Sequence, residues 1–172
     1  MNSIDLKDFL DHKAATYEQP HFLKHDPIQI PHLFDKKEDI EIAGFLVASI
    51  AWGNRLSIIK SGKRMLELMG NDPYHFVMQH TEKDLVPFST FVHRTFNGGD
   101  LCYFIKALKN LYSRHNGLEA AFSNIDKTNR IDQNIHRFRN TFFELVHEER
   151  TEKHVPYLLK CSAAKRINIF LR

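Results

Sequence analysis

Residues 35–55 read DKKEDIEIAGFLVASIAWGNR, and this stretch decides the fold of the 172-residue chain. Two acidic residues near its start suit the positive N-terminal end of a helix. The apolar residues that follow cover nearly every face of such a helix, which is typical of a helix that other elements surround. We therefore predict a buried central helix that begins at Asp35 or Lys36 and ends at Gly53.

Helix signals continue on both sides of this segment. Asn54 can cap a following helix that Gly70 ends, and Asp72 followed by Pro73 is a start signal for a short helix. The remaining helices are predicted over residues 3–17, 100–116 (capped by Asp100), 118–125 and 130–149. No segment shows the alternating pattern of a strand. The sequence thus predicts an all-α fold, a multi-helix bundle of roughly eight or nine helices in a single domain over residues 1–172.

Residues 19–35 interrupt this helical pattern. They contain Pro20, Pro27 and Pro31, which rule out a continuous helix. The segment is nevertheless too apolar for a flexible linker, so we predict an extended strap that packs over the domain.

The C-terminal residues 162–172, SAAKRINIFLR, keep helical spacing without the glycine, asparagine or proline that usually ends a helix. A short turn near residues 155–159 and a break near Cys161 precede them, which predicts a hairpin of two helices. We expect the chain to be truncated here, so that the apolar face of the last helix frays or packs against a second copy as a homodimer. That face consists of Ile167, Phe170 and Leu171.

The net charge of +3 conceals an asymmetry. Residues 1–105 carry 11 Lys/Arg and 14 Asp/Glu, a net charge of −3, whereas residues 106–172 carry 13 Lys/Arg and 7 Asp/Glu, a net charge of +6. A basic half of this kind is expected of a phosphate-binding face. It is equally compatible with ordinary solvated helix surfaces.

Several classes of protein are disfavoured by the composition. No apolar run approaches the about 18 residues of a membrane span, and the acidic, amphipathic start is unlike a secretory signal. Cys102 and Cys161 lie outside any metal-binding spacing, which favours the reducing cytoplasm. The eleven histidines lack ligand spacing and no glycine-rich phosphate loop occurs. We therefore expect no membrane partner, no metal and no cofactor.

The first candidate site is the sequence AWGNR at residues 51–55. Trp52 could stack on a nucleotide that Asn54 and Arg55 hydrogen-bond. The same residues could also be a core aromatic followed by an ordinary helix cap.

The second candidate site is the predicted hairpin. Free backbone N–H groups at the start of its second helix would lie beside Lys160, Lys165 and Arg166, which suits a DNA phosphate. Ser162 and Asn168 belong to the same segment and complete the candidate DNA contacts. A plain solvent-exposed basic turn would show the same pattern.

Four segments carry a resemblance to a known family. They are DPIQIPHLF (26–34), DIEIAGFLVASIAWGNR (39–55), FVHRTFNGGDLCYFIKALKNLYSRH (91–115) and SAAKRINIFLR (162–172). These segments resemble an uncharacterised bacterial family, the "domain of unknown function twenty-four hundred" family, over essentially the whole chain. Members of that family continue past the end of this sequence, and their continuation resembles the helix-hairpin-helix DNA glycosylases of the endonuclease-three-like superfamily.

The glycosylase resemblance implies roles for two segments. Lys165 matches a lysine that attacks the sugar C1′ of a flipped nucleotide when burial lowers its pKa, and Asn168 matches an asparagine three residues later. Trp52, Asn54 and Arg55 match a wedge after the first long helix. Two features depart from the superfamily. The hairpin loop of this chain lacks the glycines of the superfamily's loop. The essential aspartate of the superfamily lies in a later segment, which this chain does not contain.

Two functions follow from these observations. The first is a DNA-binding, glycosylase-like domain of the base-excision repair type that lacks its C-terminal part, and is inactive alone, with duplex or damaged DNA as its partner. The second is a non-catalytic helical binding or scaffold protein that keeps the fold without the chemistry. A metal-dependent hydrolase is a minor third reading.

Overall fold

The computed structural model describes residues 3–123, 130–158 and 162–171 of the chain. Most of these residues are helical, which confirms the all-α prediction. The α-helices in the described ranges are α1 (Ser3–Tyr17), α2 (Pro20–Leu23), α3 (Lys37–Ser49), α4 (Arg55–Leu68), α5 (Pro73–Gln79), α6 (Gly98–Arg114), α7 (Gly117–Phe122), α8 (Ile131–Phe142) and α9 (Lys165–Leu171). Short 3-10 helices lie between them: η1 (Pro27–Gln29), η2 (Pro31–Leu33), η3 (Val86–Thr90) and η4 (Glu149–His154).

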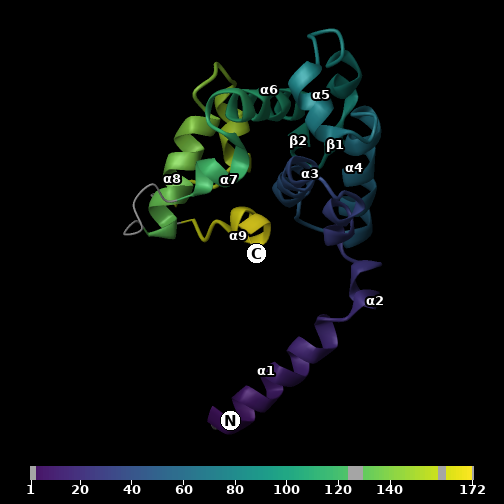
Figure 1. Cartoon of the computed structure of the whole chain (residues 1–172), viewed down its shortest axis with the longest axis vertical. Coiled ribbons are helices and arrows are strands. Elements are labelled where there is room, and N and C mark those ends of the chain that lie inside the picture. Colours follow the sequence, from purple (N-terminus) through teal and green to yellow (C-terminus); the bar gives the residue numbers. More distant parts are fainter. Residues whose placement is uncertain (1–2, 124–129, 159–161, 172) are drawn as a thin grey trace.

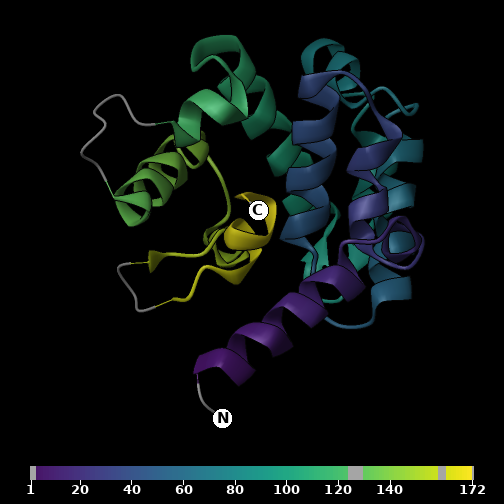
Figure 2. The same ribbon diagram turned by 60° about the horizontal axis from the view of Figure 1, so that its bottom comes forward.

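Helix α6 connects two groups of helices (Figure 1). On one side lie α3, α4 and α5, and on the other lie α7 and α8. Helix α9 lies between the two groups in both views (Figures 1 and 2). Its Phe170 packs against Phe45 of α3 and Phe122 of α7. The C-terminal helix therefore fills the space that the two groups leave between them.

The predicted central helix is α3, and it supplies the middle of the core. Ile42 and Phe45 are fully buried. The ring of Phe45 contacts the rings of Phe104, Phe138, Phe142 and Phe170, which come from α6, α8 and α9. The helix ends at Ser49 rather than at Gly53, because its last turn tightens into 3-10 hydrogen bonds, from Ile50 N to Val47 O (3.2 Å) and from Ala51 N to Ala48 O (3.1 Å).

The proline-rich segment is not the extended strap that the sequence predicts. Each proline starts a short helical turn, in α2, η1 and η2, because its fixed φ and missing N–H suit the first position of a helix. Ile30 is fully buried. It lies against Gly62 of α4, where an added Cβ would stand 2.4 Å from the Ile30 Cδ1. The segment is therefore packed as predicted, in a different conformation.

A short hairpin that the sequence does not reveal precedes α6. Strand β1 (Val92–His93) pairs antiparallel with β2 (Phe96–Asn97), and two-residue strands are too short to show an alternating pattern. Asn97, not Asp100, caps α6. Its side chain accepts from the Asp100 N–H at 3.0 Å, and Asp100 accepts from the Asn97 N–H at 2.9 Å. Asp100 is thus the reciprocal member of a capping box.

Helix α8 is shorter than the sequence pattern predicts, since it ends at Phe142 rather than near residue 149. The hydroxyl of Tyr103 donates to the Phe142 carbonyl at 2.8 Å and replaces the next helical hydrogen bond. Ile131 and Val146, which the pattern places on the buried stripe, are exposed.

The C-terminal helix is packed within the chain. Residues 155–157 are not helical and residues 159–161 lie outside the described ranges, so the second helix of the predicted hairpin, α9, is the part that is observed. Ile167 is buried and Phe170 packs against the core. Two of the three residues of the predicted face, Ile167 and Phe170, therefore have neighbours within the chain, whereas Leu171 is exposed. A homodimer through α9 stays a prediction.

Helix α1 projects away from the other helices (Figures 1 and 2). Its apolar residues Leu6, Phe9 and Leu10 are exposed. Across the described ranges, no helix combines the length and the apolar character that a membrane crossing requires.

Gly98, at the first position of α6, offers a test of this packing. An added Cβ at Gly98 would stand 2.3 Å from the Ser89 carbonyl oxygen and 2.5 Å from that of Phe88, whereas at Gly99 the nearest atom is the Asn97 Oδ1 at 3.4 Å. We expect Gly98→Ala to lower the free energy of unfolding by about 2 kcal/mol, because the backbone of η3 or of α6 must move to make room for the methyl group. Gly99→Ala is the matched control and is expected to leave stability unchanged or slightly raised. Denaturant unfolding checks both; equal effects would contradict the close approach of η3 to α6.

Candidate functional site

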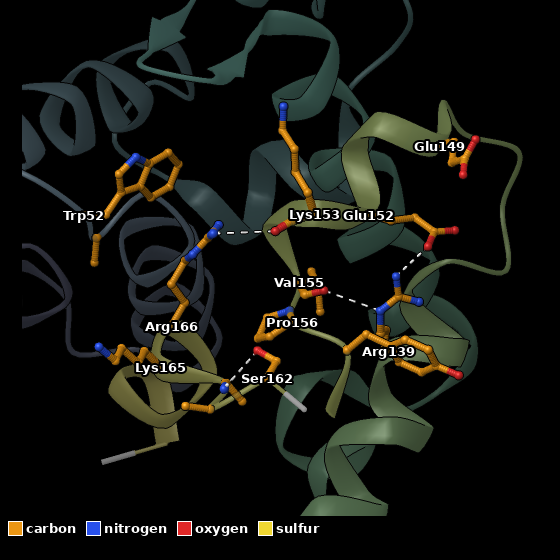
Figure 3. Close-up of a pocket in the computed structure, with 14 residues that line it drawn as sticks. Trp52, Arg139, Glu149, Glu152, Lys153, Val155, Pro156, Ser162, Lys165 and Arg166 are labelled. Atoms are coloured by element: carbon orange, nitrogen blue, oxygen red, sulfur yellow. Dashed lines mark hydrogen bonds and ion pairs between the residues drawn. The ribbon is translucent and has the colours of Figure 1, made fainter. Parts of the chain in front are cut away.

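A pocket of about 680 Å³ lies where the loop after α3, η4 and α9 meet (Figure 3). Its charged and aromatic lining includes Trp52, Arg139, Glu152, Lys153, Lys165 and Arg166. Figure 3 shows Trp52, Lys165 and Arg166 on one side of the pocket, and Arg139, Glu149 and Glu152 on the other. We refer to the first group, together with Lys153 of η4, which also lines the pocket and whose carbonyl accepts from Arg166, as the basic side.

Arg166 holds the basic side together. Its guanidinium carbon lies 4.5 Å from the centre of the Trp52 ring, a cation–π contact. The guanidinium also donates to the backbone carbonyls of Ser49 (3.3 Å), His154 (3.2 Å) and Lys153 (3.5 Å). Burial lowers the pKa of Arg166. Arg166, a predicted DNA contact, is thus engaged in joining α9 to the end of α3 and to η4.

Behind the basic side lies the fully buried carboxylate of Asp100. Its Oδ2 accepts from Arg150 Nη1 at 3.0 Å, and its Oδ1 accepts from the Thr151 hydroxyl at 2.8 Å. Nε2 of His154 lies 3.2 Å from Oδ2. Arg150 also donates to the Thr95 carbonyl at 3.1 Å. We call Asp100, Arg150, Thr151 and His154 the Asp100 network; it fixes η4 against the start of α6, since a buried carboxylate is costly unless paired and hydrogen-bonded.

His154 belongs to this network as a neutral side chain. It is 1% exposed, and its ring lies nearly parallel to that of Trp52, with centroids 6.0 Å apart. Burial is the main cause that lowers the pKa of His154 to about 4; Arg166 and Lys153 add to the shift, while Asp100 opposes it. At neutral pH the basic side therefore carries no charge on this ring.

The other side of the pocket is built around Arg139. Its guanidinium contacts the rings of Phe143 (4.9 Å) and Tyr157 (4.8 Å). Its Nη2 lies 2.5 Å from Glu152 Oε2, and its Nε donates to the Val155 carbonyl at 3.4 Å. The hydrogen bond from Arg139 is the main cause that lowers the pKa of Glu152. This guanidinium and carboxylate thus neutralise each other.

Lys153 and Lys165 supply the uncompensated charge of the basic side. Both are exposed, and within the described ranges neither lies at ion-pair distance from a carboxylate. Figure 3 shows Glu149 and Glu152 across the pocket from Lys165. No three His, Cys, Asp or Glu side chains of the described residues gather where they could hold a metal ion.

The structure brings part of the predicted site together. Trp52, Ser162, Lys165 and Arg166 line the pocket, with the Ser162 hydroxyl accepting from the Ala164 N–H at 3.2 Å. Lys165 is exposed, whereas the nucleophile role implies a buried amine. Lys160 lies outside the described residues.

The other predicted contacts have local structural roles. Asn54 caps α4 by accepting from the Ser57 N–H at 3.3 Å. Arg55 lies 4.0 Å from Asp26, next to the proline-rich segment. Asn168 donates to the Ala163 carbonyl at 3.0 Å.

Sequence reasoning does not single out Lys153 or Arg139, since neither lies in a motif. It assigns Asp100 to a helix cap and misses its buried ion pair with Arg150. A weak signal existed in the charge asymmetry, because all of these residues except Asp100 belong to the basic half 106–172.

Residues 26–172 match the family described as a protein of unknown function (DUF2400). The chain belongs to this family. The match confirms the first step of the resemblance, and the comparisons give no support for the further likeness to DNA glycosylases. No curated protein and no solved structure matches significantly. The pocket lies wholly within the DUF2400 region, whereas α1 and α2 precede it.

The buried His154 makes the stability of this DUF2400 domain depend on pH. Its pKa rises from about 4 in the folded chain to the ordinary 6.5 on unfolding, so between these values the unfolded chain binds a proton that the folded chain does not. The free energy of unfolding should therefore fall as the pH falls from 6.5 to 4, by on the order of 3 kcal/mol from this group.

The measurement is denaturant unfolding across this pH range for the wild type and for His154→Gln. Burial also lowers the pKa of His93, so the difference between the two proteins isolates His154. The variant should lose part of the pH dependence; parallel curves would contradict a neutral, buried His154.

Proposed function

We propose that this protein binds nucleic acid through the basic side of the pocket, with Lys153 and Lys165 as phosphate contacts. The observation that carries the proposal is the pair of exposed ammonium groups, without a carboxylate partner among the described residues, beside the charged Arg166 at a concave surface. Lysine contacts to phosphate supply most of the non-specific affinity for nucleic acid. The positive charge of the half 106–172 supports a polyanion as the ligand.

In this proposal the protein recognises the sugar-phosphate backbone of the nucleic acid rather than its bases. The ring of Trp52 already contacts the Arg166 guanidinium, the His154 ring and the edge of the His93 ring. A base cannot stack there without displacing one of them. Phosphate contacts position a nucleic acid without reading its sequence, so we propose a binder with little sequence preference.

Salt-dependent binding tests the proposal. Fluorescence anisotropy with labelled duplex, abasic duplex and single-stranded DNA should show affinities that fall steeply with salt. For duplex, Lys153→Ala and Lys165→Ala should each reduce the slope of log K against log [salt] by about 0.9, since each removes one phosphate contact. Arg114→Ala is the matched control. Arg114 is exposed at the far end of α6, a helix of 17 residues and roughly 25 Å, and its loss should leave the slope unchanged.

Absence of binding at low salt would overturn the proposal and favour a helical scaffold without a nucleic-acid role. Equal losses from Arg114→Ala and from the two lysine variants would also overturn it, because the charge would then act without a defined site.

A more specific hypothesis adds glycosylase-like chemistry to DNA binding, with Lys165 as the nucleophile that attacks damaged DNA. The exposure of Lys165 favours a phosphate contact instead, because its ammonium group is open to a phosphate at the surface of the protein. We therefore expect no covalent adduct when the protein is treated with abasic DNA and borohydride, although the DNA is bound. A trapped adduct that Lys165→Ala abolishes would contradict this expectation and establish the lyase reading.

A further inference from the structure

Arg94, at the tip of the β1–β2 hairpin, is a third exposed cation near the pocket, after Lys153 and Lys165. Its guanidinium lies over Gly53, where an added Cβ would stand 2.2 Å from Nη1. Gly53 directly follows Trp52, which lines the pocket. Arg94 therefore extends the positive charge of the basic side beyond the pocket, around the corner that leads into α4.

The backbone of Arg94 is held in a left-handed conformation, with φ of 56°. Asparagine tolerates this region, and Asn71 and Asn116 also occupy it in this chain. For an arginine the conformation is unfavourable, because its Cβ approaches the following carbonyl. The loop between β1 and β2 has only two residues, and the favoured turns of this length require a positive φ at the first of them, so the hairpin itself holds Arg94 in this conformation.

The hairpin tip is anchored on both sides of Arg94. His93 Nδ1 lies 2.8 Å from the Ser61 hydroxyl of α4. On the other side, the Thr95 carbonyl accepts from Arg150 at 3.1 Å, and Arg150 is bound to the buried Asp100. The structure therefore presents the Arg94 guanidinium from a rigid support, as a pre-organised contact requires.

Within the described ranges, no carboxylate lies at ion-pair distance from Arg94. By contrast, Arg55 and Arg150 lie 4.0 Å from Asp26 and 3.0 Å from Asp100. The packing against Gly53 positions the charge of Arg94 without neutralising it. A fixed and unpaired guanidinium is the arrangement that binds a phosphate group.

We propose that Arg94 is a phosphate-binding residue that holds one strand of nucleic acid at the Gly53 corner while Lys153 and Lys165 hold it at the pocket. This inference rests on the proposed function and specifies its ligand: a continuous strand that spans both places, rather than a mononucleotide or a free phosphate. The lysines and Arg94 then contact different phosphates of the same strand.

The Arg94→Asn variant of the full chain tests this role. Asparagine accepts the left-handed backbone, so the thermal midpoint should be unchanged or higher. Binding of duplex DNA should nevertheless weaken, with the salt slope reduced by about 0.9. Arg94→Lys keeps the charge and should keep the slope, and Arg114→Ala should change neither quantity.

The length of the ligand gives a second, variant-free measurement. The wild type should bind inorganic phosphate and a mononucleotide far more weakly than an oligonucleotide, with affinity rising until the strand reaches both contacts. Arg94→Asn should reach its plateau at a shorter length. A mononucleotide that binds as well as a long strand would overturn the inference.

The outcomes separate this inference from the function on which it rests. If the wild type binds no nucleic acid, both fail. If the wild type binds, and the lysine variants lower the slope while Arg94→Asn changes neither slope nor affinity, the Arg94 role alone is wrong. If Arg94→Asn fails to fold, Arg94→Gly, which also accepts the left-handed backbone, takes its place with the same expected losses.

Discussion

The carboxylate of Asp100 is the constraint on which the arrangement around the pocket depends. A charge without solvent contact costs several kcal/mol unless partners satisfy it. Asp100 is located by its own helix, because it is the reciprocal member of the capping box with Asn97, and the positive end of α6 also favours its charge. Arg150 and Thr151 must come to this point to complete its hydrogen bonds. The position of η4 is therefore dictated by the start of α6.

Once η4 is in place, the pocket follows from it. The carbonyls of Lys153 and His154 face the guanidinium of Arg166, which in turn lies on Trp52. Helix α9 is thus tied to η4 by polar bonds and to α3 and α7 by the ring of Phe170. Burial is the main cause of the depressed pKa of His154, and Arg166 adds to it, because a protonated ring would repel the guanidinium. The charged groups that hold these elements together, such as Asp100 and Arg166, are buried or paired, whereas Lys153 and Lys165 are exposed at the rim of the pocket.

Local signals in the sequence predict local structure well in this protein. The buried helix α3 and the caps Asn54 and Asp72 are found because their causes lie within a few residues. The end of α8 is missed because a distant contact determines it, the hydrogen bond from Tyr103 to the Phe142 carbonyl, whereas α3 ends early in a local 3-10 turn.

The same distinction holds for the candidate site. Trp52 and Lys165 are predicted because each lies at a helix boundary, which the sequence reveals. The hydrogen bonds of Arg166 could not be predicted, since its three carbonyl partners come from η4 and the end of α3. Lys153 and Arg94 reach the basic side through tertiary structure that no spacing in the sequence encodes.

Two strained residues on this face differ in what compensates them. Ala164 has φ of 48° and is 1% exposed; it leads into α9, and its carbonyl accepts the helical bond from Asn168 at 2.9 Å. The left-handed backbone conformation of Ala164 costs about 1–2 kcal/mol, and burial of its methyl group and the start of a packed helix offset this cost. Arg94 incurs a similar cost, yet its side chain is exposed. Packing therefore accounts for the strain at Ala164, whereas at Arg94 the two-residue loop between β1 and β2 accounts for the positive φ, because the favoured turns of this length require it at their first residue.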